Sequence, residues 1–177
     1  AFLNQPWGLA VSNDEATLYI ADHGNHRVRA VDLASGNIVT FAGGSSNSTA
    51  PYGDGGRADA AYVPNPRFLG VGPDGSLYVA SMSIYRIRRI DPAGTISTVV
   101  EPQSHCGSAT FGVGNCVSND STGCSFVVEP DGSLLVQFAA ACGTSQVGEF
   151  YVSNAPAIVR WNPDRTYTRY AGRYAPA

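Results

Sequence analysis

The sequence predicts an all-β fold built from three related four-stranded antiparallel units. The first observation is a repeated pentapeptide, Pro-Asp-Gly-Ser-Leu, at residues 73–77 and 130–134. The second is composition, because 20 Gly and 11 Pro divide the 177 residues into short segments. The third is the alternation of apolar and polar residues over these segments, which is typical of half-buried strands. Together they indicate a chain of hairpins.

The repetition extends well beyond the pentapeptide. The first unit, "PWGLAVSNDEATLYIADHGNHRVRAVDLASGNIVTFAGG", covers about residues 6–44, and the second, "PRFLGVGPDGSLYVASMSIYRIRRIDPAGTISTVVE", covers about residues 66–101. Each contains four short apolar segments separated by turn residues, where Pro presets φ and Gly accepts a left-handed conformation. We therefore expect an antiparallel meander in each unit. In chain order the strands centre on Leu9/Val11, Leu18/Ile20, Val28/Val31 and Ile38/Phe41, then on Leu69/Val71, Leu77/Val79, Ile87/Ile90 and Ile96/Val99.

The third unit, about residues 124–172, is more divergent. Its first hairpin, "CSFVVEPDGSLLVQF", and its last, residues 157–172, are separated by an insertion at residues 139–156. Matching valines at positions 11, 71 and 128 are 60 and 57 residues apart. A four-stranded unit repeated at this period predicts a partial β-propeller with three blades, as one segment over residues 1–177.

Several motifs of the first two units resemble a known family. "LYIADHGNHRVRAVD" followed by "IVTFAGG", then "YGDGGRADAAYVPNPRFLGV" and "LYVASMSIYRIRRID", closely resemble NHL-repeat propellers. The resemblance implies that Asp22, Asn25 and Arg27 are hydrogen-bonded signature residues. The second unit has Ser81 in the place of Asp22 and keeps Arg86.

Three blades do not close a ring, and the resemblance implies about six. The terminal blades would therefore expose apolar faces, which mark interaction surfaces. Both ends of the sequence resemble parts of one connector between blades. Three arrangements follow: a fragment of a longer propeller, half of a two-copy ring, or a subunit of an open filament. The expected partners are therefore other copies of the chain or the remaining blades of a longer one.

Cysteine usage predicts an oxidising compartment. Cys106, Cys116, Cys124 and Cys142 lie within 37 residues without metal-binding spacing, so we expect two disulfides, in any of three pairings. Glycosylation sequons begin at Asn47 and Asn119. These features predict an extracellular, secreted glycoprotein.

Charge excludes some classes of partner. The net charge is −3 without a basic stripe, which argues against nucleic acid. No apolar run approaches the roughly 18 residues that span a bilayer. The alternation of arginines with apolar residues predicts one polar strand face that forms hydrogen bonds with solvent or with a neighbouring blade. The alternative role of this face is to bind an anionic glycan. Proteins are the other expected class of partner. The arginines of this face are Arg27, Arg29, Arg86, Arg88 and Arg89.

Candidate catalytic groups are few. His23 and His26 could form half of a metal site, but a site needs three or four ligands and the third histidine, His105, is distant in sequence. Asp54 and Asp59 lack the spacing of a calcium loop, which favours a structural turn. We therefore expect a non-enzymatic binding or structural scaffold without a cofactor. The alternative is a piece of a six-bladed metal-dependent lyase or hydrolase.

Overall fold

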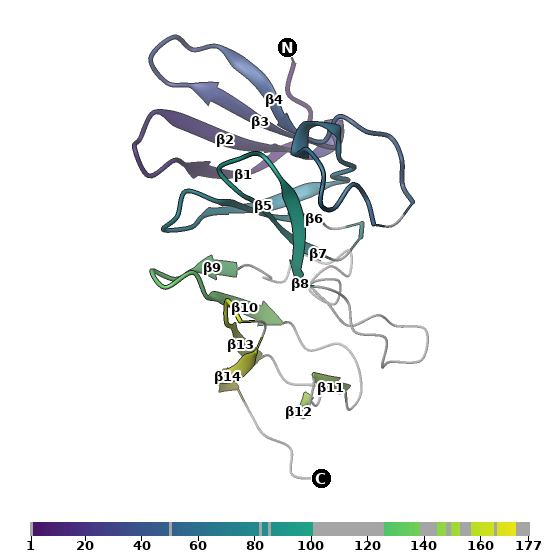
Figure 1. Ribbon diagram of the computed structural model, residues 1–177, viewed down its shortest axis with the longest axis vertical. Helices are drawn as coiled ribbons and strands as arrows, with labels where there is room; N and C mark the ends of the chain where they lie inside the picture. Colours follow the sequence, from purple (N-terminus) through teal and green to yellow (C-terminus); the bar gives the residue numbers. More distant parts are fainter. Residues whose placement is uncertain are drawn as a thin grey trace.

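The computed structural model contains three four-stranded antiparallel sheets (Figure 1). The strands of the first two sheets are consecutive in the chain, and the third sheet is interrupted by one insertion. It describes residues 2–49, 51–81, 83–84, 86–100, 126–138, 145–147, 150–152, 157–164 and 166–172. The sheets follow one another along the long axis of the molecule (Figure 1). The predicted all-β class and the three four-stranded units are confirmed. We call the sheets blades 1, 2 and 3.

Blade 1 has the strand order β1-β2-β3-β4 and carries a short 3-10 helix between β2 and β3. Its elements are β1 (Pro6–Val11), β2 (Thr17–Asp22), η1 (His23–Asn25), β3 (Arg27–Asp32) and β4 (Ile38–Ala42). A connector containing a second 3-10 helix, η2 (Ala58–Ala60), leads to blade 2. Blade 2 repeats the order with β5 (Pro66–Val71), β6 (Leu77–Ser81), β7 (Arg86–Ile90) and β8 (Ile96–Val100).

Blade 3 has the same meander with an insertion in its middle. Its strands are β9 (Phe126–Val128), β10 (Leu134–Phe138), β13 (Ala157–Trp161) and β14 (Tyr167–Gly172). A separate hairpin, β11 (Ser145–Val147) with β12 (Phe150–Val152), lies within the predicted insertion. Cys106, Cys116, Cys124, Cys142 and Asn119 lie outside the described residues.

The repeated pentapeptide forms the same turn in blades 2 and 3. Gly75 and Gly132 have φ angles of 81° and 83°, which a residue with a side chain adopts at a cost. The carboxylates of Asp74 and Asp131 accept the backbone N–H two residues later, at 3.0 and 2.9 Å. This local hydrogen bonding explains why the pentapeptide recurs: it closes the first hairpin of both blades 2 and 3.

Each blade has two faces, because successive side chains of a strand point to opposite sides of its sheet. The face turned toward the preceding blade is called the leading face, and the other the trailing face. Two apolar cores result. One joins the trailing face of blade 1 (Val28, Ala42) and the connector to the leading face of blade 2 (Leu77, Val79, Ile90, Ile96). The other joins the trailing face of blade 2 (Tyr78, Ala80, Ile87, Val100) to the leading face of blade 3 (Phe126, Leu134, Val136).

The first strands of neighbouring blades lie close together. β1 contacts β5, and β5 contacts β9. A Cβ atom added at Gly8 would lie 2.3 Å from the carbonyl oxygen of Arg67, so the approach of β1 to β5 requires glycine there. Among the residues that the structure describes, no helix is long and apolar enough to cross a bilayer.

Among the described residues, each outer blade leaves apolar side chains of one face exposed. On the leading face of blade 1, Leu9 is 61% and Val11 is 47% exposed, whereas the matching Leu69 and Val71 of blade 2 pack against the first core. On the trailing face of blade 3, Val127 is 58% exposed. One of these faces is a leading face and the other is a trailing face. Inside the chain, a trailing face packs against the leading face of the next blade.

Candidate functional site

An ion pair joins the connector to the leading face of blade 2. Arg88 of β7 is 0% exposed, and its Nε donates to Oδ1 of Asp54 at 2.9 Å. Its Nη2 also donates to Asp54, and its Nη1 donates to the carbonyl of Tyr62 at 2.8 Å. The backbone N–H and the hydroxyl of Thr98 donate to Oδ2 of Asp54 at 3.2 and 2.5 Å. The guanidinium and the carboxylate therefore fasten the connector to blade 2.

The environment of Arg88 affects its basicity in two directions. Burial lowers the pKa of Arg88 below its ordinary value, and the hydrogen bond and negative charge of Asp54 act in the opposite direction. A buried charge needs such a partner, because transfer of an ion from water to the protein interior costs on the order of several kcal/mol. The role of Asp54 is thus to neutralise and orient a buried guanidinium.

The predicted arginine face forms only in part: Arg27 and Arg29 share one side of β3, and Arg86 and Arg88 share one side of β7. Arg88 and Arg89 are adjacent, so they point to opposite faces of blade 2, and Arg89 pairs with Asp74 at 2.7 Å. Arg29, like Arg88, is buried, whereas Arg27 is exposed. The prediction that all five arginines share one face was wrong at Arg89, because Arg89 follows Arg88 directly in the strand. The connector supplies the carboxylate that makes burial of Arg88 possible.

The signature residues lie around the start of the chain. Asp22 is buried and accepts from the backbone N–H of Asn4 at 2.8 Å and from the amide of Asn25 at 3.0 and 2.9 Å. Arg27 is exposed, and the side-chain donors described for Asp22 do not include it. The guanidinium of Arg86 lies over the ring of Tyr52, 5.0 Å from its centroid.

Both candidate histidines bind the first residues of blade 2. His23 Nδ1 is 3.2 Å from the carbonyl of Pro66, and its Nε2 is 3.2 Å from the amide nitrogen of Asn65. His26 Nδ1 accepts the backbone N–H of Asn65 at 3.1 Å. Over the described ranges, no three His, Cys, Asp or Glu side chains are grouped to hold a metal ion. The two histidines thus fasten the loop after β2 to the following blade.

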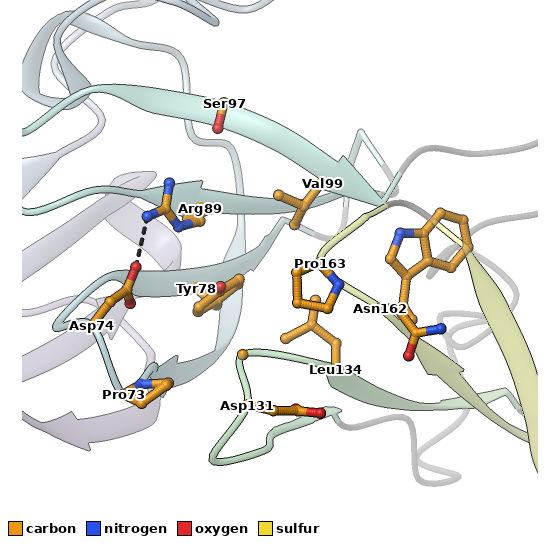
Figure 2. A pocket seen from close by; sticks show the side chains of 12 residues that line it. Pro73, Asp74, Tyr78, Arg89, Ser97, Val99, Asp131, Leu134, Asn162 and Pro163 are labelled. Carbon is orange, nitrogen blue, oxygen red and sulfur yellow. Dashed lines mark hydrogen bonds and ion pairs between the residues drawn. The ribbon is translucent and has the colours of Figure 1, made fainter.

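A second candidate site is a cleft of about 410 Å³ between blades 2 and 3 (Figure 2). Three hairpin turns line it with polar groups, and Tyr78, Leu134 and Trp161 line it with apolar surface. Figure 2 shows the ion pair of Asp74 and Arg89 at one side of the cleft. Aromatic rings beside fixed hydrogen-bonding groups suit a small polar ligand or a side chain of a partner. The lining residues are Pro73, Asp74, Tyr78, Arg89, Ser97, Val99, Asp131, Gly132, Leu134, Trp161, Asn162 and Pro163.

The carboxylates of this cleft are paired with arginines at matching positions. Arg89 holds Asp74, and Arg160 holds Asp131 at 2.7 Å and Glu129 at 2.5 Å. Position 30 in blade 1, which matches Arg89, is an alanine. The joint occurrence of the pentapeptide and a third-strand arginine was a signal in the sequence that could have identified these pairs.

The pair of Asp74 and Arg89 predicts a specific pH dependence. The hydrogen bond from Arg89 is the main cause that lowers the pKa of Asp74 to about 2. Because this pKa lies below that of an unfolded aspartate, the pair stabilises the fold above about pH 4 and loses its effect as pH falls from about 4 to 2. We expect Asp74→Asn to destabilise the chain at pH 6, with a difference from wild type that shrinks toward pH 2. Urea unfolding at both pH values measures it, and an equal difference at both would contradict the assignment.

Comparisons with known proteins agree with this architecture. A family profile described as NHL repeat matches residues 3–31. Protein SUPPRESSOR OF QUENCHING 1, chloroplastic, of Arabidopsis thaliana is 32% identical over 89 residues, which are 50% of this chain and 8% of that protein. The chain therefore spans a small part of this relative.

Solved structures share the fold at low sequence identity. A gluconolactonase of Xanthomonas campestris has a TM-score of 0.57 and 14% identity over 96% of this chain and 48% of its own. A chain of a nidogen/laminin complex has a TM-score of 0.55 and 12% identity over 94% of this chain and 48% of its own. A streptogramin B lyase has a TM-score of 0.53 and 14% identity over 93% of this chain and 40% of its own. The repeat profile matches blade 1, and the three sheets have the fold of β-propeller blades.

Proposed function

We propose that the chain is a non-enzymatic binding and structural module that works by joining blade to blade. The observation that carries this proposal is the uncovered leading face of blade 1, where Leu9 and Val11 are exposed. In blade 2 the matching face is covered by blade 1 and by the connector. A face built for the same contact is expected to bind another blade.

The histidines support the non-enzymatic assignment. His23 and His26 use their ring nitrogens to hold Asn65 and Pro66, so these atoms serve the contact between blades. The cleft between blades 2 and 3 is the candidate surface for a protein or glycan ligand, because it combines aromatic rings with charged groups. Its carboxylates are held by arginines, which suits recognition of a polar ligand.

The two uncovered faces also support head-to-tail association. Inside the chain, each trailing face receives the next leading face, and Val127 and Leu9 belong to the two faces without such a partner. In a solution of this chain alone, the blade that can cover one face is that of a second copy. Copies joined in this way close into a ring or continue as a filament, according to the rotation between them.

Sedimentation velocity over a range of protein concentrations tests the proposal. We expect wild type to associate and Leu9→Glu to stay monomeric, because the charge would be buried in the joined face. Val39→Glu is the matched control, since Val39 is 58% exposed but lies on the trailing side of blade 1. A wild type that is monomeric at every concentration would refute association through this face.

We further propose that the chain is extracellular and glycosylated at Asn47. Asn47, Ser48 and Thr49 are exposed in the connector after blade 1, where a glycan would project into water. Expression through a secretory pathway should give a mass that falls after treatment with peptide N-glycosidase and should change with Asn47→Gln. An unchanged mass with an unmodified Asn47 peptide would oppose the assignment.

A further inference from the structure

Blade 1 contains a second copy of the buried arginine site, in which one member is missing from the described residues. Arg29 occupies the position of Arg88: Arg29 is paired with Ile20 and Thr40, as Arg88 is paired with Val79 and Thr98. Arg29 is only 7% exposed. Its register places it on the leading face of blade 1, at the position that corresponds to the connector-binding position of Arg88 in blade 2.

The hydrogen bonds of the two arginines differ in one respect. Arg88 uses its Nε to hold Asp54. In Arg29 the Nη1 donates to the hydroxyl oxygen of Thr40 at 3.1 Å, but Nε is buried and has no partner among the described residues. A buried guanidinium nitrogen without an acceptor is unfavourable, because it has lost water without a replacement. The unpaired atom, Arg29 Nε, corresponds to Arg88 Nε, which donates to the carboxylate of Asp54.

The position of Thr40 completes the comparison. In blade 2 the N–H and hydroxyl of Thr98 both donate to Asp54. Thr40 stands at the same register beside Arg29. Arg29 and Thr40 thus present the donor groups that hold an aspartate in blade 2. A guanidinium with adjacent hydroxyl and amide donors binds a carboxylate through charge-assisted hydrogen bonds.

We propose that Arg29 and Thr40 form a docking site for an aspartate carried by a glycine-rich connector that enters blade 1 from a further blade. The occupant has the chemistry of the internal connector, Gly-Asp-Gly-Gly at residues 53–56. Glycine is needed there because Gly53 and Gly55 have φ angles of 88° and 82°. This inference rests on the proposed function, since it assigns a specific contact to the joining face of blade 1.

Blade 3 provides an internal contrast. The position that matches Arg29 and Arg88 is Val159, which pairs with Val136 of β10. Blade 3 therefore has no arginine at this place. The aspartate site is thus a property of blades 1 and 2, and the contact of blade 3 with its predecessor relies on other groups, including its apolar core.

The experiment supplies the missing segment in the same polypeptide. Residues 51–60, "PYGDGGRADA", are fused ahead of Ala1, so that the grafted aspartate precedes Ala1 by the seven positions that separate Asp54 from Ala61. We expect the melting temperature to rise by about 2–4 °C or more. We also expect the Arg29 Nε–H to exchange more slowly with solvent in ¹⁵N NMR spectra.

Two matched variants isolate the carboxylate. In the first, the grafted aspartate that corresponds to Asp54 is replaced by alanine. In the second, Arg29→Met is introduced into the grafted chain. Both should lose the added stability, and the first should also lose protection of the Arg29 Nε–H. Equal melting temperatures for the aspartate and alanine grafts, with unchanged Nε–H exchange, would overturn the inference. Association of the ungrafted chain through Leu9 would still support the proposed function, so the two failures can be distinguished.

Discussion

Replacing Asp54 by Ala is expected to lower the free energy of unfolding by about 3–5 kcal/mol, because it leaves a fully buried guanidinium without its counterion. The carboxylate of Asp54 receives both Nε and Nη2 of Arg88 and two donors of Thr98, so its removal leaves all four donors without this acceptor. Urea unfolding monitored by circular dichroism measures the change. The effect should appear mainly as a shift in midpoint.

Controls separate the buried pair from ordinary surface charge. Asp59→Ala removes a carboxylate of the same connector that pairs with the exposed Arg57, and we expect little change. The double variant Asp54→Ala with Arg88→Met should lose less free energy of unfolding than the two single variants lose together, because it removes the unpaired charge. Equal losses for Asp54→Ala and Asp59→Ala would contradict the role assigned to Arg88.

The second large effect is expected at Leu77. Leu77 is buried between blades 1 and 2, and Leu77→Ala should lower the free energy of unfolding by about 2–5 kcal/mol through lost apolar contact and a cavity. Leu18 occupies the same position in blade 1, but it is only partly buried because its face lacks a neighbouring blade. Leu18→Ala should therefore have a clearly smaller effect.

Denaturation of both variants at low protein concentration measures this difference. Low concentration matters because association would cover the leading face of blade 1 and bury Leu18. At high concentration the effect of Leu18→Ala should grow while that of Leu77→Ala stays constant. Equal effects of the two substitutions on the monomer would show that the two faces are equally covered.

Local sequence patterns were sufficient to predict the hairpins. The pentapeptide carries its own turn chemistry, because Asp74 binds the N–H of Ser76 and Gly75 adopts a positive φ angle. Alternation of apolar residues then placed Leu77 and Val79 on one face of a strand. These features depend on neighbours within a few residues, so they can be predicted without the register between strands.

The buried arginine could not be predicted in the same way. Arg88 and its partner Asp54 are 34 residues apart, and their contact depends on how the connector enters between two blades. Sequence alone gives Arg88 the same appearance as its neighbour Arg89, which pairs near the surface. Similarly, the spacing of His23 and His26 suggested a ligand pair, but their partners lie in Asn65 and Pro66, about 40 residues further along the chain.

Head-to-tail joining of blades is the central claim, and mixing two capped variants tests it most directly. Leu9→Glu blocks the leading face of blade 1 and Val127→Glu blocks the trailing face of blade 3, so each variant alone should sediment as an 18.5 kDa monomer. An equimolar mixture retains one intact pair of faces and should form a complex of twice that mass. A mixture that remains monomeric while wild type associates would contradict head-to-tail joining through these faces.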